Sequence, residues 1–249
     1  MSKQSGLGDR LYVEGVDLSG DVGAIQTIRG GHGVIDATGI NSSGVERFAT
    51  VRDGEISFNA YYNVAAGAAH LTLSPLPRTN VGVSYFRGHA LGSPTATMTA
   101  VQVNYDPARG ADGSLTATIQ ALSNHTTHGL LYGQMVDAGQ RTDGSATTPT
   151  AGLDDLDAGV DSDFGATMWV HLIAFTGTSV TFTLRDAATE PTYANVTGGA
   201  SSALTAAGYE VWSTSATQNI RRYLTVGTTG TFSNAVFAFG VARHLSAVL

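Results

Sequence analysis

The chain has 249 residues, of which only 13% are charged, and its formal net charge is −7. An acidic balance argues against a nucleic-acid-binding protein, which needs a basic face to neutralise phosphates. Because the chain has no cysteine, a disulfide framework, a thiol nucleophile and a thiolate metal site are excluded. The 42% hydrophobic share is close to that of a globular protein, and threonine, serine, alanine and glycine replace the missing charges. Such a surface suits packing against other proteins.

The first ten residues contain no apolar stretch behind Lys3, so they do not form a secretory signal. The longest apolar runs, such as residues 168–175, are far shorter than the ~18 residues that span a bilayer. We therefore expect the protein to be made and kept in a cytoplasm.

Alternating apolar and polar side chains, which have the period of a β-strand, dominate the first half of the chain. They predict strands at residues 54–62, 81–86, 95–105 and 114–123. The turn signal at residues 111–113 predicts that the last two strands form a hairpin with a long loop. We expect the core to contain the aromatic residues of these strands: Phe58, Tyr61, Tyr62, Tyr85 and Phe86.

A single short helix is predicted within residues 64–76, which are rich in alanine. Asn63 is a favourable N-cap at its start, and neither Pro75 nor Pro77 at its end can continue a helix. Gly67 lies inside the segment and weakens the helix without abolishing it.

Residues 141–163 are rich in threonine, glycine, alanine and aspartate, a composition typical of a linker. Turns such as 176–178 and 228–231 follow it and separate short predicted strands at 166–175, 179–186, 209–214, 220–226 and 235–242. This spacing is typical of a small antiparallel sandwich. The predicted fold class is therefore all-β, mainly antiparallel, with one short helix, and with domains at residues 1–140 and 164–249.

Candidate metal ligands are few. His125 and His128 are the only close histidine pair, but on a strand their spacing places them on opposite faces, and a solvated loop is favoured over a metal site. An acidic run in the predicted linker could supply oxygen ligands to calcium, although it lacks the glycine and the distal glutamate of an EF-hand loop. We favour a linker kept soluble by its charge over a calcium site for this run: Asp154, Asp155, Asp157, Asp161 and Asp163.

No catalytic motif is present. Gly30, Gly31 and Gly33 lack the Lys-Ser or Lys-Thr that completes a phosphate-binding loop, so a flexible loop or strand bend is favoured there. There is no Gly-x-Ser-x-Gly elbow and no His-Glu-x-x-His motif. We therefore expect no enzymatic activity, no cofactor and no metal. On alternation one of Arg221 and Arg222 faces inward and needs a partner, for which Asp186 and Glu210 are candidates.

Four segments of the first 140 residues occur in a characteristic order: MSKQSGLGDRLYVEGVDLSGDVG, VERFATVRDGEISFNAYYN, the alanine-rich helix with His70 and LSPLP, and VSYFRG. This order resembles that of the major tail (tail tube) proteins of long-tailed bacteriophages of actinobacteria. The resemblance implies a tail-tube-like β-barrel or sandwich domain. The second half resembles the small sandwich domains that are appended to virion proteins.

The resemblance implies a subunit that forms hexameric rings, which stack into a tube through which DNA passes without specific binding. Its partners would be copies of itself and other tail proteins, in a virion tail assembled in the host cytoplasm and away from any membrane. The long hairpin would pair edge to edge with neighbouring subunits through Thr97, Thr99, Val101, Val103, Leu115, Ala117 and Ile119. Contacts between stacked rings would come from a loop that contains Asn41, Ser42, Ser43, Glu46 and Arg47.

Two alternatives remain open. One is a virion protein in a different position, such as a minor tail subunit or a capsid-decorating subunit. The other is a carbohydrate-binding adhesion module that presents aromatic side chains to glycans, for which the candidates are Trp169, Tyr193, Tyr209 and Trp212. Alternation places Trp169 on one face with His171 and Ile173, which predicts that this indole is at least half-buried.

Overall fold

The computed structural model describes residues 6–154 and 161–244, and nearly all of its regular structure is antiparallel β-sheet, which confirms the all-β prediction. The chain forms two compact units: the sandwich unit (residues 1–20, 84–97 and 132–249) and the hairpin unit (residues 21–83 and 98–131). Strands β5 (Val81–Phe86) and β6 (Pro94–Gln102) each run from one unit into the other. The division predicted at residues 140 and 164 does not coincide with these units and stays a prediction.

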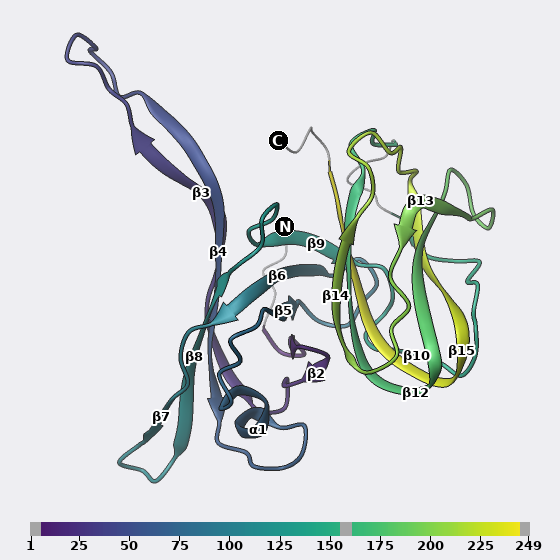
Figure 1. Ribbon diagram of the computed structural model, residues 1–249, viewed down its shortest axis with the longest axis horizontal. Helices are drawn as coiled ribbons and strands as arrows, with labels where there is room; N and C mark the ends of the chain where they lie inside the picture. Colours follow the sequence, from purple (N-terminus) through teal and green to yellow (C-terminus); the bar gives the residue numbers. More distant parts are fainter. Residues whose placement is uncertain (1–5, 155–160, 245–249) are drawn as a thin grey trace. The chain divides into compact units, whose positions relative to one another are not determined.

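Three long strands form the sheet of the hairpin unit, in the order β3 (Val22–Asp36), β4 (Arg47–Tyr61) and β8 (Leu115–Ser123) (Figure 1). The other edge of β8 pairs with the end of β6 and with the short strand β7 (Asp106–Arg109). The backbone N–H of Gly110 donates to Ser114 O (2.7 Å) and closes a tight turn between β7 and β8. The predicted pairing of 95–105 with 114–123 is confirmed, but β7 occupies the place of the predicted long loop.

The helix α1 (Ala69–Leu73) is shorter than the predicted segment 64–76, and its N-cap is Ala68 rather than Asn63. Ala68 offers no side-chain hydrogen bond, so Asp21 replaces it: its Oδ2 accepts from the backbone N–H of Ala69 (2.8 Å). The Asn63 side chain instead caps the turn before the helix, where its Oδ1 accepts from Ala65 N–H (3.1 Å). Among the described residues, no helix has the length and apolarity needed to cross a membrane.

Two long strands of the sandwich unit, β12 (Ala166–Ala187) and β15 (Tyr223–Arg243), pair along their whole lengths. The turns predicted at 176–178 and 228–231 are wrong, because both segments lie inside these strands. Register shifts between Thr176 and Ser179 bend the ribbon without ending it. The other strands of this unit are β1 (Arg10–Val13), β2 (Val16–Asp17), β9 (Leu131–Met135), β10 (Arg141–Asp143), β11 (Leu153–Asp154), β13 (Ala194–Ala200) and β14 (Gly208–Ser213).

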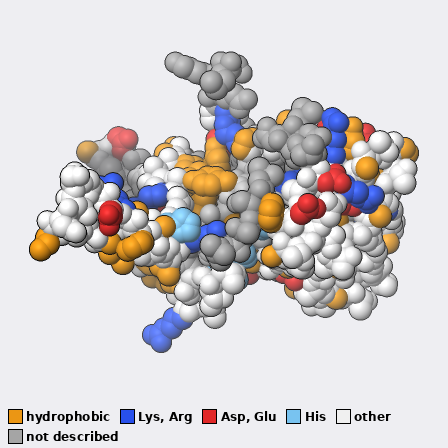
Figure 2. Space-filling model, turned by 90° about the horizontal axis from the view of Figure 1, so that it is seen from above, with side chains coloured by type: hydrophobic (Ala, Val, Ile, Leu, Met, Phe, Trp, Pro, Cys, Tyr) orange, Lys and Arg blue, Asp and Glu red, His pale blue; other side chains and the backbone are white. Residues whose placement is uncertain are grey.

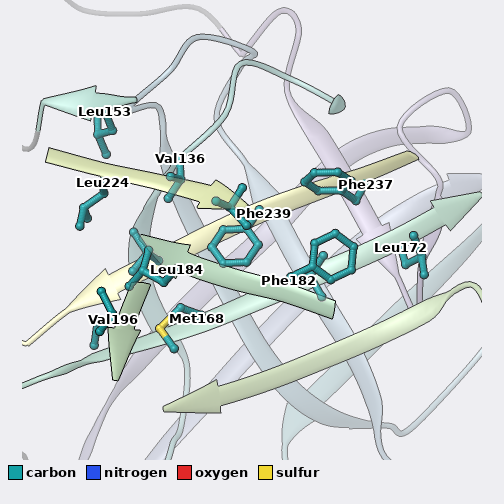
Figure 3. Packing of buried hydrophobic residues seen from close by; sticks show 14 of the residues in the cluster. Val136, Leu153, Met168, Leu172, Phe182, Leu184, Val196, Leu224, Phe237 and Phe239 are labelled. Carbon is teal, nitrogen blue, oxygen red and sulfur yellow. The ribbon is translucent and has the colours of Figure 1, made fainter. Parts of the chain in front are cut away.

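The bent ribbon encloses the main hydrophobic core. Met168 and Leu172 from the first half of β12 pack in one cluster with Phe182 from its second half and with Phe237 and Phe239 from β15 (Figure 3). The strands β13 and β14 pair with β12, while β9, β10 and β11 pair with β15, so both long strands have partners on each side. This cluster is free of solvent, as its aromatic members are 0% exposed.

The other face of β12 is buried as well. Trp169 packs in a second cluster with Tyr12 and Phe86, and His171 from the same face stacks on the Tyr12 ring. The predicted sharing of a face by Trp169 and His171 is therefore confirmed. The first half of β12 is buried on both sides, which explains its uninterrupted apolar sequence.

Candidate assembly surface

The most exposed apolar surface of the hairpin unit lies on the outer half of the β3–β4 hairpin. β8 pairs with β4 only from Glu55 to Tyr61, so residues 31–53, here called the arm, extend as a two-stranded ribbon beyond the sheet (Figure 1). Its exposed apolar side chains are Val34, Ile35, Ile40, Val45, Phe48 and Val51. A lone two-stranded ribbon is marginally stable in water and exposed apolar clusters mark interaction sites, so the arm is a candidate contact surface.

Both faces of the arm carry apolar side chains. Ile35 lies opposite Phe48 in the ribbon, and the next pair, Val34 with Ala49, points to the other face. Phe48 is 66% exposed and Val51 is 82% exposed. In Figure 2 hydrophobic side chains also gather on the left-hand part of the molecule, where β3 and β4 lie.

The root of the arm is fixed by a close backbone approach. A Cβ atom at Gly54 would lie 2.7 Å from the Leu130 backbone nitrogen, and one at Gly30 would lie 2.9 Å from Leu130 Cβ. A Cβ at Gly129 would in turn lie 2.7 Å from Asp53 O. Gly30 lies within strand β3, where the absence of a side chain lets Leu130 pack on the ribbon. The flexible loop predicted for this segment is not seen, but the register shift between His32 and Val34 is the kind of irregularity that bends a strand, which was the other prediction.

The sheet of the hairpin unit has two free edges. Among the described strands, β3 pairs only with β4, and β7 pairs only with β8. Unpaired strand edges present rows of N–H and C=O groups that recruit another strand unless something covers them. Both edges are therefore candidates for pairing with another strand.

A second exposed apolar surface lies where β4 ends. This surface, here called the patch, consists of Tyr62, Val64, Leu71 and Leu115, while the exposed ring of Tyr61 lies beside Gly23 of β3. Tyr62 N–H donates to Leu115 O (3.0 Å). The centroid of the Tyr62 ring lies 4.4 Å from that of His70, the residue before Leu71 in the helix. The Tyr105 hydroxyl is 2.9 Å from His70 Nδ1 and holds that imidazole in place.

The core position predicted for Tyr61 and Tyr62 is wrong, whereas Phe58 and Phe86 are buried as predicted. Tyr61 pairs with Thr116 in the last rung of the β4–β8 ladder, so no further strand residues cover its ring. The sequence shows the alternation of this strand, but it does not show where the covering layer stops.

The interface residues predicted from the resemblance are distributed unevenly. Thr97, Ala117 and Ile119 are buried, while Val103 and Leu115 are exposed, and Thr99 and Val101 are half-buried. The predicted loop between rings forms the tip of the arm, where four of its five residues are exposed and Ser42 is half-buried: Asn41, Ser42, Ser43, Glu46 and Arg47. Their interface roles stay predictions. The apolar residues of the arm lie beside this loop. The sequence analysis did not identify them as contact residues, although their apolar character is visible in the sequence.

The histidine pair does not form a chelating site. The rings of His125 and His128 stack with centroids 5.0 Å apart and an angle of 12° between their planes. The lone pairs of stacked imidazoles lie in parallel planes, so both rings do not point at a single ion. Across residues 6–154 and 161–244, no three histidine or acidic side chains converge on a possible metal.

Part of the predicted linker belongs to the sandwich unit. β10 and β11 lie within residues 141–163, and both pair with β15. Asp154 forms an ion pair with Arg222 (2.6 Å), and this partner lowers the pKa of the Asp154 carboxyl. Asp163 accepts a hydrogen bond from Asn219 (2.8 Å), while Asp155 and Asp157 fall outside the described residues.

The predicted partner of Arg221 is confirmed as Asp186, whose carboxylate accepts from both Nε and Nη2 (2.9 and 2.6 Å). Glu210, the other candidate, accepts instead from Ser202. Arg221 and Arg222 are each about a third exposed, so the alternation that places only one of them inward does not apply. The reason is that β15 begins after both of them, at Tyr223.

A serine–histidine pair exists in the sandwich unit, but it is sealed from solvent. His171 Nδ1 accepts from Gly15 N–H (3.2 Å), so its proton is on Nε2, which donates to Ser84 Oγ (2.7 Å). Burial lowers the pKa of His171 to about 3. Both side chains are 0% exposed, so no substrate reaches them, and the pair acts as a structural network.

A charged cluster in the same unit is also structural. Arg141 donates from Nε and Nη2 to Asp143 (2.8 and 2.7 Å), and from Nη1 to Asp137 Oδ1 (3.2 Å). The Asp143 carboxylate is further bonded by the Thr228 hydroxyl (2.6 Å). Asp137 Oδ2 is buried and has no hydrogen-bond partner within the described part of the chain, and burial raises the pKa of the Asp137 carboxyl.

The aromatic residues considered for glycan binding do not form an exposed platform. Trp169 and Tyr193 are buried, and Tyr209 and Trp212 are half-buried. The Trp212 ring packs edge-on against Phe239, which belongs to the main core. Stacking on a sugar needs an accessible ring face, so these residues do not support the carbohydrate-binding alternative.

Comparisons with solved structures find similarity to parts of phage tails and baseplates. One is the Dit protein of SPP1, described as a paradigm of the hub adsorption apparatus in phages that infect Gram-positive bacteria: 12% identity, TM-score 0.34, covering 94% of this chain and 99% of that chain. A second is the tail of an empty gene transfer agent particle, refined with C6 symmetry: 16% identity, TM-score 0.37, covering 50% of this chain and 96% of that chain. A third is the phage p2 baseplate in its activated conformation: 10% identity, TM-score 0.31, covering 96% and 99%.

No model of a known protein family matches the chain, and no curated protein sequence matches it.

Proposed function

We propose that this chain is a non-enzymatic structural subunit of a bacteriophage tail, and that copies of it join into rings that stack as a tube. The observation that carries the proposal is the open sheet of the hairpin unit, with its free edges at β3 and β7 and its exposed arm. An open-edged sheet is an aggregation hazard in a free monomer, whereas a closed ring of copies covers every edge. The resemblance of residues 1–140 to tail tube proteins supports the same arrangement and implies six copies in a ring.

The charge of the chain is compatible with a DNA conduit. Its formal net charge is −7, and a lumen with the same sign as DNA repels phosphates, so that the duplex passes without being held. The partners in this proposal are other copies and other tail proteins, and DNA passes without specific binding. The place of action is the virion tail, after assembly in the host cytoplasm.

The sandwich unit has a different place in this proposal. It buries its large aromatic residues Trp169, Phe182, Phe237 and Phe239 in two hydrophobic clusters. Its surface is poor in charge and rich in threonine and serine, which suits contacts on the outside of the tube. We propose that it decorates the ring rather than lines it.

Negative-stain electron microscopy with light scattering on the same sample tests this function. We expect rings or short tubes with a central hole, and a mass that rises with concentration. A matched pair of variants separates assembly from folding: Phe48→Glu in the arm and Thr229→Glu at an exposed position of the sandwich unit. Only the first should abolish the rings. A particle that stays monomeric at concentrations approaching millimolar would overturn the proposal.

A further inference from the structure

A small polar pocket lies in the sandwich unit, where β13 runs beside β12 and β15 pairs with the other edge of β12 (Figure 1). Its volume is about 250 Å³. Most small-molecule sites measure roughly 300–1,000 Å³, so this pocket takes a ligand no larger than a single ring. Its lining is made of four threonines with one arginine, one asparagine and one glycine, and none of the described residues that line it is acidic or aromatic.

The Thr183 hydroxyl is the deepest polar group of the pocket. Phe182 and Leu184, on either side of it, belong to the main core, so Thr183 points the other way. This residue is only 9% exposed, and its hydroxyl has no hydrogen-bond partner in the described part of the chain. Buried hydroxyls are normally paired, since an unpaired one loses its bonds to water without replacement. The Thr183 hydroxyl is therefore available to a molecule that enters the pocket.

The Arg185 guanidinium supplies the charge of the pocket and is held in place. Nε donates to Asn195 Oδ1 (3.0 Å), Nη1 to Pro149 O (3.2 Å) and Nη2 to Tyr193 O (2.8 Å). All three acceptors are neutral, and further N–H groups of the guanidinium remain to donate. Three other arginines of this unit each form an ion pair with an aspartate: Arg141, Arg221 and Arg222. Arg185 forms no ion pair within the ranges 6–154 and 161–244, so its charge is left for a ligand to compensate.

Gly227 keeps the floor of the pocket open. A Cβ atom there would lie 3.0 Å from Arg185 Cδ and 3.5 Å from Thr147 O, so a side chain would crowd the arginine. The β12–β13 pairing is irregular between Thr183 and Arg185, and irregularities of this kind re-aim side chains next to binding sites. The rim is exposed and polar, and consists of Thr148, Asn195 and Thr229.

We propose that this pocket binds a small carboxylate that also carries hydroxyl groups, such as a sugar acid. The ligand carboxylate accepts from Arg185, and the ligand hydroxyls bond to Thr183 in the floor and to the threonines of the rim. A neutral sugar would leave the arginine charge uncompensated, and a bare anion would leave the Thr183 hydroxyl unpaired. The inference goes beyond the proposed function and is independent of ring formation, because every group involved lies within the sandwich unit.

Ligand-observed NMR titration of the full chain with glucuronate tests the site, with glucose and acetate as the two partial ligands. We expect glucuronate to bind at least tenfold more tightly than either. Thr183→Val removes the hydroxyl while it keeps the shape of the side chain, and it should weaken glucuronate binding roughly two- to tenfold. Thr178→Val is the matched control, since Thr178 is an exposed residue of the same strand outside the pocket, and it should leave the affinity unchanged.

A second variant tests the role of the charge without altering Arg185 or its hydrogen bonds. Thr229→Glu adds a carboxylate at the rim, where it competes with that of the ligand, and it should abolish glucuronate binding. Thr178→Glu adds the same charge outside the pocket and should have little effect. Circular dichroism of each variant checks that the sheet content is unchanged.

The outcomes separate this inference from the proposed function. Absence of glucuronate binding, or equal binding of glucuronate and acetate, would overturn the inference, as would equal binding of glucuronate and glucose. Unchanged affinity in Thr183→Val or Thr229→Glu would place the ligand elsewhere and overturn it too. Rings in electron micrographs do not depend on any of these results, so the proposed function would stand.

Discussion

Large apolar side chains are mostly buried in the sandwich unit, whereas many of them are exposed in the hairpin unit. In the sandwich unit, Phe182, Phe237 and Phe239 are fully buried, and the long strands β12 and β15 have partners on both sides. In the hairpin unit, Phe48 and Val51 lie on a two-stranded ribbon and are largely exposed. The first unit covers these aromatic side chains with its own chain. The second leaves apolar surface and strand edges uncovered, which is what a subunit of an assembly needs.

This difference distinguishes the apolar residues that stabilise the folded chain from those that favour association with another molecule. Burying a large apolar side chain contributes about 1.5–3 kcal/mol, and the sandwich unit gains this within a single chain. For the arm, the same gain is available only when another molecule covers it. Equal substitutions in the two units should therefore act on different properties.

The largest expected effect is that of Phe237→Ala. This substitution should lower the free energy of unfolding by about 3–5 kcal/mol, because it leaves a cavity against Phe182 and removes the ring beneath the Arg141 guanidinium. Urea unfolding followed by tryptophan fluorescence measures it, because Trp169 and Trp212 both lie in the sandwich unit.

The matched change in the arm is Phe48→Ala. In dilute solution it should change the free energy of unfolding by less than about 0.5 kcal/mol, since the ring is already in water. Circular dichroism during urea unfolding reports on the whole chain. Equal losses of stability for Phe48→Ala and Phe237→Ala would contradict the comparison between the units.

An effect smaller than that of Phe237→Ala is expected at the root of the arm. Gly54→Ala should cost about 1–3 kcal/mol locally, because the new methyl group would meet the Leu130 backbone at 2.7 Å. Gly31→Ala is the control, since no atom lies within 4 Å of a Cβ there. Hydrogen exchange of the β3 and β4 amides measures the difference: exchange should become faster in Gly54→Ala and stay unchanged in Gly31→Ala. Equal exchange in both variants would show that Leu130 does not fix the root.

The buried histidine of the sandwich unit predicts a pH dependence. The pKa of His171 is about 3 in the folded protein, against an ordinary value of about 6.5 in an unfolded chain. Between these values the unfolded state binds a proton that the folded state does not. The contribution of neutral His171 to the free energy of unfolding is therefore fully present above about pH 6.5. It falls by up to about 1.4 kcal/mol per pH unit as the pH drops toward 3.

His171→Gln isolates this contribution, because an amide keeps one acceptor for Gly15 N–H and one donor for Ser84. We expect the free energy of unfolding to depend less steeply on pH in the variant, by the equivalent of about one bound proton. Urea unfolding at several pH values measures this slope. A slope identical to that of the unmodified chain would mean that His171 does not remain neutral in the folded state.

Much of the local structure was predictable from alternation alone. The strand at 81–86 matches β5 residue for residue, and the shared face of Trp169 and His171 follows from the period of a strand. The partner of Arg221, Asp186, was one of the two carboxylates named as candidates. These features depend on side chains that are close in sequence or on a choice among few partners.

The candidate site was predicted only in part. The loop at the tip of the arm was identified from the resemblance, but the apolar ribbon that carries it was not. Val34, Ile35, Phe48 and Val51 have the composition of a core strand, and nothing local distinguishes a covered strand from an uncovered one. The position of Tyr61 was wrong for the same reason, since exposure depends on where the neighbouring strand ends.

The amino-acid sequence by itself determined the class of fold, because alternation with period two and the absence of long helical periodicity leave only strands to form. The tertiary structure decided where strands continue and which surfaces they leave bare. The segment 176–178 continues as part of β12 because β15 supplies a partner along its whole length, and the helix begins at Ala69 because Asp21 reaches it from 48 residues earlier. Such partners lie far apart along the chain, so only folding brings their hydrogen bonds and apolar faces together.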